Sequence, residues 1–162
     1  MTIGSFDGFE PKLEHIYDMH ADLEPPQSIP GGPMGERQIF IVKGGAVEGP
    51  RIRATVLPGG GDWSTRRADG AIQLDVRATL KTDDGAMIYA AYSGLIHGKV
   101  ETIVAAATGQ NPPLTDYYFY TNPMFQADAE KYQWLNQVVA LGRGRIVPGG
   151  VQYRVWALTN PT

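Results

Sequence analysis

The segment from Pro58 to Trp63 reads PGGGDW and places an acidic and an aromatic side chain directly after three glycines. Glycines let a ligand approach the backbone, and a carboxyl group beside an indole ring lies in surroundings of low polarity. Such surroundings raise the pKa of Asp62 toward values that suit a general base, while Trp63 can stack on a substrate. A structural turn explains the segment equally well, because Asp62 can accept hydrogen bonds from its own loop while Trp63 covers one end of the fold.

Asp75 and Arg77 lie two residues apart in the strictly alternating segment 71–81, so their side chains share one face of a predicted strand. If that face is in water, they form a surface ion pair worth at most about 1 kcal/mol. If it faces an interior, Arg77 can stabilise a carboxylate, phenolate or enolate there. Alternating polar faces usually contact water, which favours the surface on the pattern alone.

Five further side chains are candidates for contacts with a ligand. Tyr92 and His97 could donate hydrogen bonds to a substrate, and the three that could line its site are Tyr120, Trp134 and Asn136. Tyrosine and tryptophan more often pack in a core than bind ligands. Asn136 also fits the end of a short helical segment. These residues are therefore secondary candidates.

The chain has no cysteine, which removes disulfides, thiol catalysis and thiolate metal sites. The motifs GxSxG, GxGxxG, GxxxxGK[ST] and HExxH are missing as well. His15 and His20 are five positions apart on a predicted strand and so face opposite sides, which leaves His97 without a neighbouring ligand. We therefore expect neither a metal site nor a bound cofactor.

The length of 162 residues, with 43% hydrophobic and 19% charged residues, fits one domain, in which residues 1–11 form an N-terminal extension. The 14 basic and 17 acidic side chains form no basic block, so nucleic acid is not an expected partner. No run approaches the ~20 apolar residues of a membrane span, and the N-terminus has no apolar leader. A cytoplasmic protein is the expectation.

Alternating apolar and polar residues indicate strands along most of the chain, and clustered glycines and prolines indicate tight turns between them. The predicted strands are residues 13–23, 38–43, 51–57, 71–81, 86–93, 117–121, 137–147 and 151–158; the predicted short helices are residues 100–107 and 129–136, the second with Asp128 as N-cap. About eight to nine strands in local hairpins are compatible with two architectures, a β-sandwich or a β-barrel. We favour an all-β fold, a closed antiparallel β-barrel, because closure removes unpaired strand edges.

Asp84-Gly85 predicts the hairpin between the strands 71–81 and 86–93. With a two-residue loop, Arg77 lies opposite Tyr92 on the same face of the sheet. A loop of three or four residues shifts the register, and a shift by one residue moves Tyr92 to the other face.

Several motifs in fixed order resemble the bacterial family called domain of unknown function 3237, also uncharacterised protein family 0311. They are GAVEGPR at residues 45–51, VLPGGGDW, RADG at 67–70, LDVRATLKTDDGAMIY, YYF at 117–119 and YQWLN at 132–136. The resemblance covers roughly residues 13–158. It implies a small antiparallel β-barrel with an interior of small-molecule size and no settled reaction, and it favours an interior position for Asp75 and Arg77.

The sequence departs from the pattern of that family at three positions. Ile96 stands where a basic residue commonly precedes His97, Tyr120 where arginine usually follows the YYF segment, and Gln126 where glutamate usually follows Phe125. If the usual polar groups hold a ligand in other members, the departures imply a less charged ligand for this chain.

The leading hypothesis is a lyase or isomerase without cofactor that moves a proton on a small aromatic or conjugated-carbonyl compound. Asp62 would move the proton, Arg77 would stabilise the oxyanion, and Tyr92 or His97 would donate a hydrogen bond. One alternative is a carrier of a small apolar ligand, which needs an apolar interior. Another is an assembly module that forms a homodimer through an exposed strand face around a filled core. Convergence of the four residues in one cavity favours the enzyme.

Overall fold

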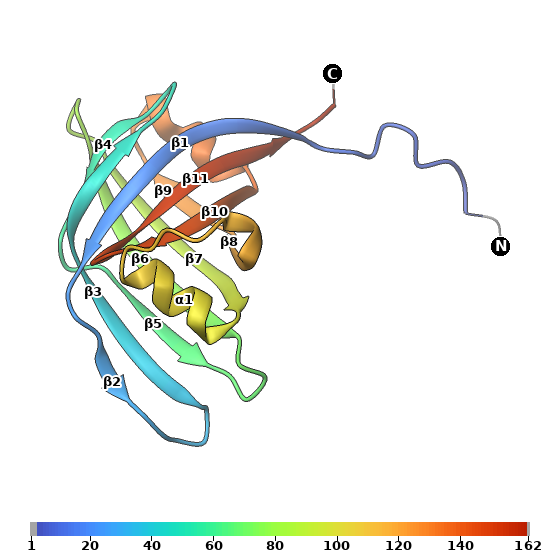
Figure 1. Cartoon of the computed structure of the whole chain (residues 1–162). Helices are drawn as coiled ribbons and strands as arrows, with labels where there is room; N and C mark the ends of the chain where they lie inside the picture. The colour runs from blue at the N-terminus through green and yellow to red at the C-terminus, as the bar shows by residue number, and fades with distance from the viewer. Residues whose placement is uncertain (1–2, 162) are drawn as a thin grey trace.

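The computed structural model describes residues 3–161. In this range, most of the alternating segments form strands of one antiparallel sheet (Figure 1). The strands are β1 (Lys12–Leu23), β2 (Gln27–Ile29), β3 (Glu36–Glu48), β4 (Arg53–Val56), β5 (Gly61–Arg66), β6 (Ile72–Thr82), β7 (Met87–Gly98), β8 (Tyr117–Thr121), β9 (Met124–Ala127), β10 (Ala140–Val147) and β11 (Gly150–Thr159). The helical segments are the α-helix α1 (Val100–Ala107) and two 3-10 segments, η1 (Leu114–Asp116) and η2 (Glu130–Gln137).

The strand pairings lead around the sheet in a ring from β3 through β5, β6, β7, β8, β10, β11 and β1 back to β3. β4 pairs with β3 and β6 beyond the end of β5, and β9 pairs with the first half of β7. β8 and β10 pair only where Thr121 meets Gly142 and Tyr120 meets Arg143. The prediction of an all-β antiparallel barrel is confirmed as a barrel-like sheet. The pairing between β8 and β10 is the shortest one in this ring.

Residues 3–161 contain 11 strands where eight or nine were predicted. The additional strands β2, β5 and β9 have three to six residues, too few for a clear period of two. Helix α1 has the predicted bounds. The second predicted helix is the 3-10 segment η2, and its N-cap is Ala129 rather than Asp128. The backbone oxygen of Asp128 instead accepts a hydrogen bond from Gln133 Nε2 at 2.7 Å.

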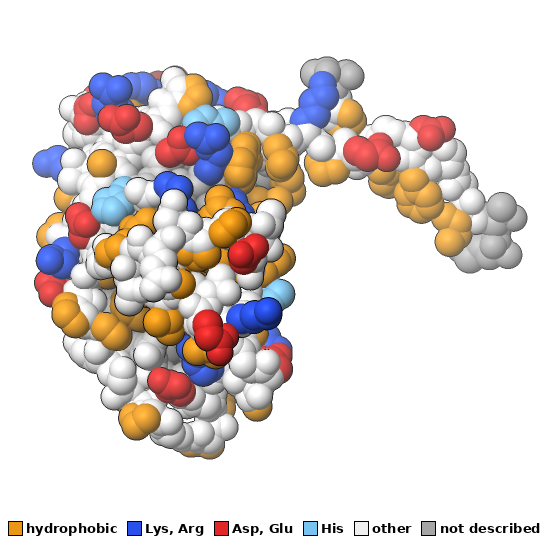
Figure 2. All heavy atoms as spheres, viewed as in Figure 1, with side chains coloured by type: hydrophobic (Ala, Val, Ile, Leu, Met, Phe, Trp, Pro, Cys, Tyr) orange, Lys and Arg blue, Asp and Glu red, His pale blue; other side chains and the backbone are white. Residues whose placement is uncertain are grey.

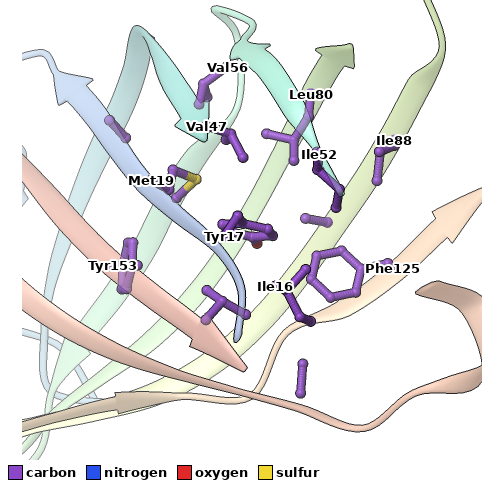
Figure 3. Packing of buried hydrophobic residues seen from close by; sticks show 14 of the residues in the cluster. Ile16, Tyr17, Met19, Val47, Ile52, Val56, Leu80, Ile88, Phe125 and Tyr153 are labelled. Carbon is purple, nitrogen blue, oxygen red and sulfur yellow. The ribbon is translucent and has the colours of Figure 1, made fainter. Parts of the chain in front are cut away.

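Alternate residues of the strands point into the barrel and form its core. On β6, the side chains of Leu74, Val76, Ala78 and Leu80 are at most 5% exposed, while Arg77 between them is exposed. Figure 3 shows side chains from several strands meeting in this core, among them Ile16, Tyr17, Met19, Val47, Ile52, Val56, Leu80, Ile88, Phe125 and Tyr153. The sheet thus has one apolar inner face and one polar outer face.

The β6–β7 hairpin turns through residues 83–85, three rather than two, with Gly85 at a φ of 88°. A left-handed backbone of this kind favours glycine at the end of a three-residue turn. The register places Val76 opposite Tyr92. Arg77 and Tyr92 therefore lie on opposite faces of the sheet, which is the alternative that a one-residue shift produces.

Residues 3–11 leave the barrel ahead of β1 (Figure 1) and carry exposed apolar side chains, which Figure 2 shows in orange. Ile3, Phe6 and Phe9 are all more than half exposed, and the two phenyl rings pack edge to face at 4.9 Å. Residues 1 and 2 of the predicted extension lie outside the described residues. No helix within residues 3–161 is long and apolar enough to cross a membrane.

Candidate functional site

Asp62 points into the barrel from β5. It lies in a row of cross-strand partners that runs from Phe40 on β3 through Asp62 and Val76 to Tyr92 on β7. Residues directly opposite in an antiparallel ladder share one face of the sheet, and Val76 belongs to the core. Asp62 and Tyr92 therefore face the interior on either side of Val76. Both side chains are partly exposed.

The carboxylate of Asp62 interrupts the ladder between β5 and β6. The two strands pair at Asp62 and again from Thr65 onward, but not at the two positions between. There the amide of Asp75 donates to Asp62 Oδ1 at 3.0 Å, and the carbonyl of Trp63 accepts from Arg37 Nη1 at 2.8 Å. The backbone thus fixes one carboxylate oxygen in place.

The other oxygen, Asp62 Oδ2, has no hydrogen-bond partner in residues 3–161. In the same part of the chain, the buried side-chain polar atoms without a partner are Thr121 Oγ1 and Trp134 Nε1. Asp62 Oδ2 is therefore not sealed in the core. A carboxylate with one oxygen held and one oxygen accessible has the geometry of a positioned general base.

The surroundings raise the pKa of Asp62 to about 6. Burial is the largest cause, because it penalises the charged carboxylate. The hydrogen bond from the Asp75 amide lowers the pKa and the negative charge of Asp75 raises it, both by less than burial. A carboxyl group with this pKa is largely ionised at neutral pH and still basic enough to accept a proton.

Tyr153 reaches the same region from β11. Its ring lies 5.7 Å from the ring of Tyr92, edge to face, and 5.4 Å from that of Phe119. Burial is the largest cause that raises the pKa of Tyr92 and of Tyr153, and the charge of Asp62 raises both as well. The contact between the two hydroxyls raises the pKa of Tyr92 and lowers that of Tyr153, by less than burial raises it. The two phenols therefore stay neutral near physiological pH and can donate hydrogen bonds beside Asp62.

Tyr153 and Tyr17 are not among the site residues predicted from the sequence. Tyr17, on β1, is 2% exposed, and burial with the nearby Tyr92 raises its pKa as well. The signal for Tyr153 is present in the last strand, where it alternates in phase with the apolar residues Val151 and Val155. Inward-facing tyrosines in otherwise apolar strand faces would have identified both residues.

Arg77, Asp75 and Trp63 lie on the outer face of the barrel. Arg77 Nη1 is 3.2 Å from Asp75 Oδ1 with both side chains at least half exposed, and the guanidinium lies 5.5 Å from the Trp63 ring. The interior position that the family resemblance favoured for Arg77 and Asp75 is therefore wrong, and the surface ion pair that the strand pattern favoured is found, because the buried residues of β6 are the even-numbered ones. Asp75 reaches the interior site only through its backbone amide.

His97 and Tyr120 also lie on the outer face. The exposed His97 ring stacks on Tyr118 at 4.7 Å, and Tyr120 packs against the guanidinium of Arg143 at 4.6 Å. Asp62, Tyr92, Arg77 and His97 consequently do not share one cavity. Among the described residues, no three His, Asp or Glu side chains gather closely enough to hold a metal ion.

Trp134 and Asn136 belong to η2, away from the row of Asp62. The Trp134 ring lies under the guanidinium of Arg51 at 3.8 Å. The side chain of Asn136 accepts from the amide of Ala127 at 2.8 Å and donates to its carbonyl at 2.7 Å. Asn136 thus ties η2 to the edge of β9, which is a structural role.

Comparisons with known proteins place the chain among β-barrel proteins. A UPF0311 protein of Rhodopseudomonas palustris is 35% identical over 108 residues, which are 67% of this chain and 71% of that protein. The crystal structure of a conserved protein of unknown function from this organism has a TM-score of 0.85 at 28% identity, over 92% of this chain and 98% of that one. A beta-barrel like protein of Acinetobacter baumannii has a TM-score of 0.81 at 31% identity, over 96% and 100%.

A more distant relative has a named activity. A hydroalkoxylation enzyme of Penicillium herquei is 29% identical over 132 residues, which are 82% of this chain and 73% of that protein. The crystal structure of an enzyme from the same organism has a TM-score of 0.70 at 26% identity, over 96% of this chain and 99% of that one. The family model described as "Protein of unknown function (DUF3237)" matches residues 11–158, and the chain belongs to this family.

Proposed function

We propose that the interior of the barrel is the active site of a lyase or isomerase that moves a proton on a small organic molecule without help from a cofactor. The observation that carries the proposal is the meeting of Asp62, Tyr92 and Tyr153 on the inner face. One side chain can accept a proton, and two neutral phenols can donate hydrogen bonds beside it. Pairs of titratable groups with divergent protonation states are a common feature of acid–base catalysis.

In the proposed reaction, Asp62 Oδ2 removes a proton from a carbon or oxygen atom conjugated with a carbonyl group or an aromatic ring. The electron pair left behind moves toward the substrate oxygen, where the hydroxyls of Tyr92 and Tyr153 stabilise the developing negative charge. The protonated carboxyl group of Asp62 then delivers the proton to another carbon atom of the conjugated system. No net oxidation or reduction occurs.

The Penicillium relative supports this class of reaction. Hydroalkoxylation adds the O–H of an alcohol across a carbon–carbon double bond, so that a proton leaves oxygen, a C–O bond forms and carbon gains the proton. Such a transfer needs a group that accepts a proton and later returns it, and a carboxyl group can do both. The carrier alternative needs an apolar interior, and it gives no reason to hold a carboxylate of raised pKa there.

Deuterium incorporation tests the proposal without knowledge of the natural substrate. The protein is incubated in D2O with β-tetralone, which has an acidic C–H between ring and carbonyl, and with o-allylphenol, which can cyclise by hydroalkoxylation. Mass spectrometry then measures deuterium uptake above the uncatalysed rate. We expect uptake with the wild type and loss by about a hundredfold or more with Asp62→Asn.

The matched control is Asp83→Asn, the same chemical change at an exposed carboxylate in the β6–β7 turn. It should exchange deuterium like the wild type. Equal rates for Asp62→Asn and the wild type, or no uptake above background by the wild type with either compound, would contradict the proposed function.

A further inference from the structure

Asp62 is the charged group of the inner site, and no cation accompanies it. The buried polar side chains of residues 3–161 are Ser64, Thr82 and Thr121, all uncharged, and no lysine, arginine or histidine of that part is buried. The causes that shift the pKa of Asp62 are burial, an amide and a second carboxylate, with no positive group among them. The site therefore offers one negative charge and neutral donors.

The arginines nearest along these strands already have partners, and Arg37 on β3 donates from Nη1 to the backbone carbonyl of Trp63 at 2.8 Å. Arg77, on the outer face, lies 3.2 Å from Asp75. Arg66 lies at the end of β5 on the side of the sheet that Asp62 shares, and its Nε is 3.6 Å from Glu36 Oε2. Each of these three guanidinium groups is thus engaged by another acceptor.

The inner face also carries a buried hydroxyl group without a hydrogen-bond partner among residues 3–161. Thr121 on β8 is 3% exposed, and its Oγ1 has no hydrogen-bond partner in residues 3–161. Its cross-strand partners are Gly94 on β7 and Gly142 on β10, where a Cβ atom would lie 2.7 Å from Thr121 Cγ2 and 2.4 Å from Oγ1 respectively. A buried hydroxyl normally has a partner, so Thr121 is an unpaired neutral polar group on the inner face.

Aromatic side chains line the wall around these polar groups. Tyr153 makes edge-to-face contacts with both Tyr92 and Phe119, which lie on the neighbouring strands β7 and β8. Aromatic rings favour offset or edge-to-face contacts with other rings, so this wall suits an aromatic ligand. The part of the inner wall around Tyr153 is thus aromatic, and Asp62 is the charged side chain in the row that leads to Tyr92.

We infer that the interior site takes a neutral aromatic hydroxyl compound, a phenol or an enol, and rejects carboxylates and phosphates. The O–H of such a ligand donates to Asp62 Oδ2, and the phenols of Tyr92 and Tyr153 are available to its oxygen. An anionic ligand would be repelled by the Asp62 carboxylate in surroundings of low polarity and would find no cation. The inference rests on the proposed function for the identity of the site, but binding alone tests it.

The test compares β-naphthol and β-naphthoate, which have the same ring system but differ in charge at about pH 7. Isothermal titration calorimetry with the full chain gives the dissociation constant of each compound. We expect β-naphthol to bind about tenfold or more tightly than β-naphthoate, with the wild type and with the control Asp83→Asn. With Asp62→Asn, the preference should shrink to within about threefold, because the repulsion is gone.

A pH titration of the wild type checks the same point without a substitution. At about pH 5, most naphthoate is still ionised while Asp62 is mostly protonated, so naphthoate should bind more tightly than at about pH 7. Equal or tighter binding of naphthoate at about pH 7, an unchanged preference in Asp62→Asn or no binding of either compound would overturn the inference. Proton transfer itself is decided separately by deuterium uptake, which does not depend on these affinities.

Discussion

The rings of Tyr92 and Tyr153 lie 5.7 Å apart, although the strands β8 and β10 separate β7 from β11 around the sheet. The contact therefore spans the interior rather than two adjacent strands. Asp62, on β5, lies in the same cross-strand row as Tyr92, with Val76 between them, and its charge adds to the burial that raises the pKa of both tyrosines. Three strands that are distant in the sequence thus bring these side chains to the inner face, where we propose the acid–base site.

Removal of either hydroxyl should slow proton transfer while leaving the ring packing in place. Tyr92→Phe and Tyr153→Phe each delete one proposed donor, and loss of one such donor costs roughly a hundredfold in rate. The exchange rate of β-tetralone measures the effect. Tyr89→Phe, on the outer face of β7, is the matched control and should exchange at the wild-type rate. Equal slowing by all three substitutions would contradict a specific role for the inner hydroxyls.

The rate of proton transfer should rise with pH through an apparent pKa of about 6, the value for Asp62. Below that pH the carboxyl group is protonated and cannot accept a proton. Above it, the rate should level off, since the raised pKa of Tyr92 and Tyr153 keeps both phenols neutral. Initial rates of deuterium uptake, corrected for the uncatalysed reaction, give the profile. A rate independent of pH between about 4 and 8 would exclude Asp62 as the base.

Asp62 should lower the stability of the fold at neutral pH. Its pKa is about 6 in the folded chain and near 3.8 when unfolded, so between these values the native state holds a proton that the unfolded state has lost. The free energy of unfolding therefore falls as pH rises through this window, by roughly 3 kcal/mol in total. Asp62→Asn removes this pH-dependent contribution to the free energy of unfolding.

Urea denaturation of Asp62→Asn and the wild type from about pH 4 to pH 8 isolates that contribution, because the other titrating groups cancel in the difference. The stability advantage of the variant should grow as pH rises to about 7 and then stay constant. A difference that does not change with pH would show that burial does not raise the pKa of Asp62.

Gly144 has no side chain because the ring of Phe119 occupies the space above it. A Cβ atom at this position would lie 2.6 Å from the Phe119 ring, which is 1% exposed and cannot move freely. Gly144→Ala should therefore cost about 1–3 kcal/mol of unfolding free energy. Gly31→Ala, with nothing within 4 Å of the added atom, is the control and should change stability by less than about 0.5 kcal/mol. Equal stability of the two variants would contradict the packing described here.

The barrel could be predicted because strand periodicity is local. The segments 71–81 and 151–158 alternate clearly, and their neighbours pair through short turns, so an antiparallel sheet follows from the sequence. Short strands such as β5 have no such signal. Asp62 and Tyr92 were candidates from residue type and local context alone.

The composition of the site could not be predicted, because the face that a side chain occupies depends on register. One additional residue in the β6–β7 turn separates Arg77 from Tyr92, and no local pattern determines that turn length. Tyr153 joins the site only through closure of the barrel, a contact between residues 61 positions apart in the sequence (92 and 153). Closure also places His97 and Tyr120 outside, since both follow the outward phase of their strands.

The most direct test of the account is the titration of the Asp62 carboxyl carbon by NMR in the wild type, with Asp62→Asn used to assign the signal. We expect a pKa of about 6, because burial penalises the charged form of the carboxyl group. We also expect that addition of β-naphthol perturbs this signal while the exposed carboxyl of Asp83 is unaffected. A pKa near the ordinary aspartate value of about 4, with no response to the ligand, would contradict the assignment of Asp62 as the proton-transferring group of an interior site.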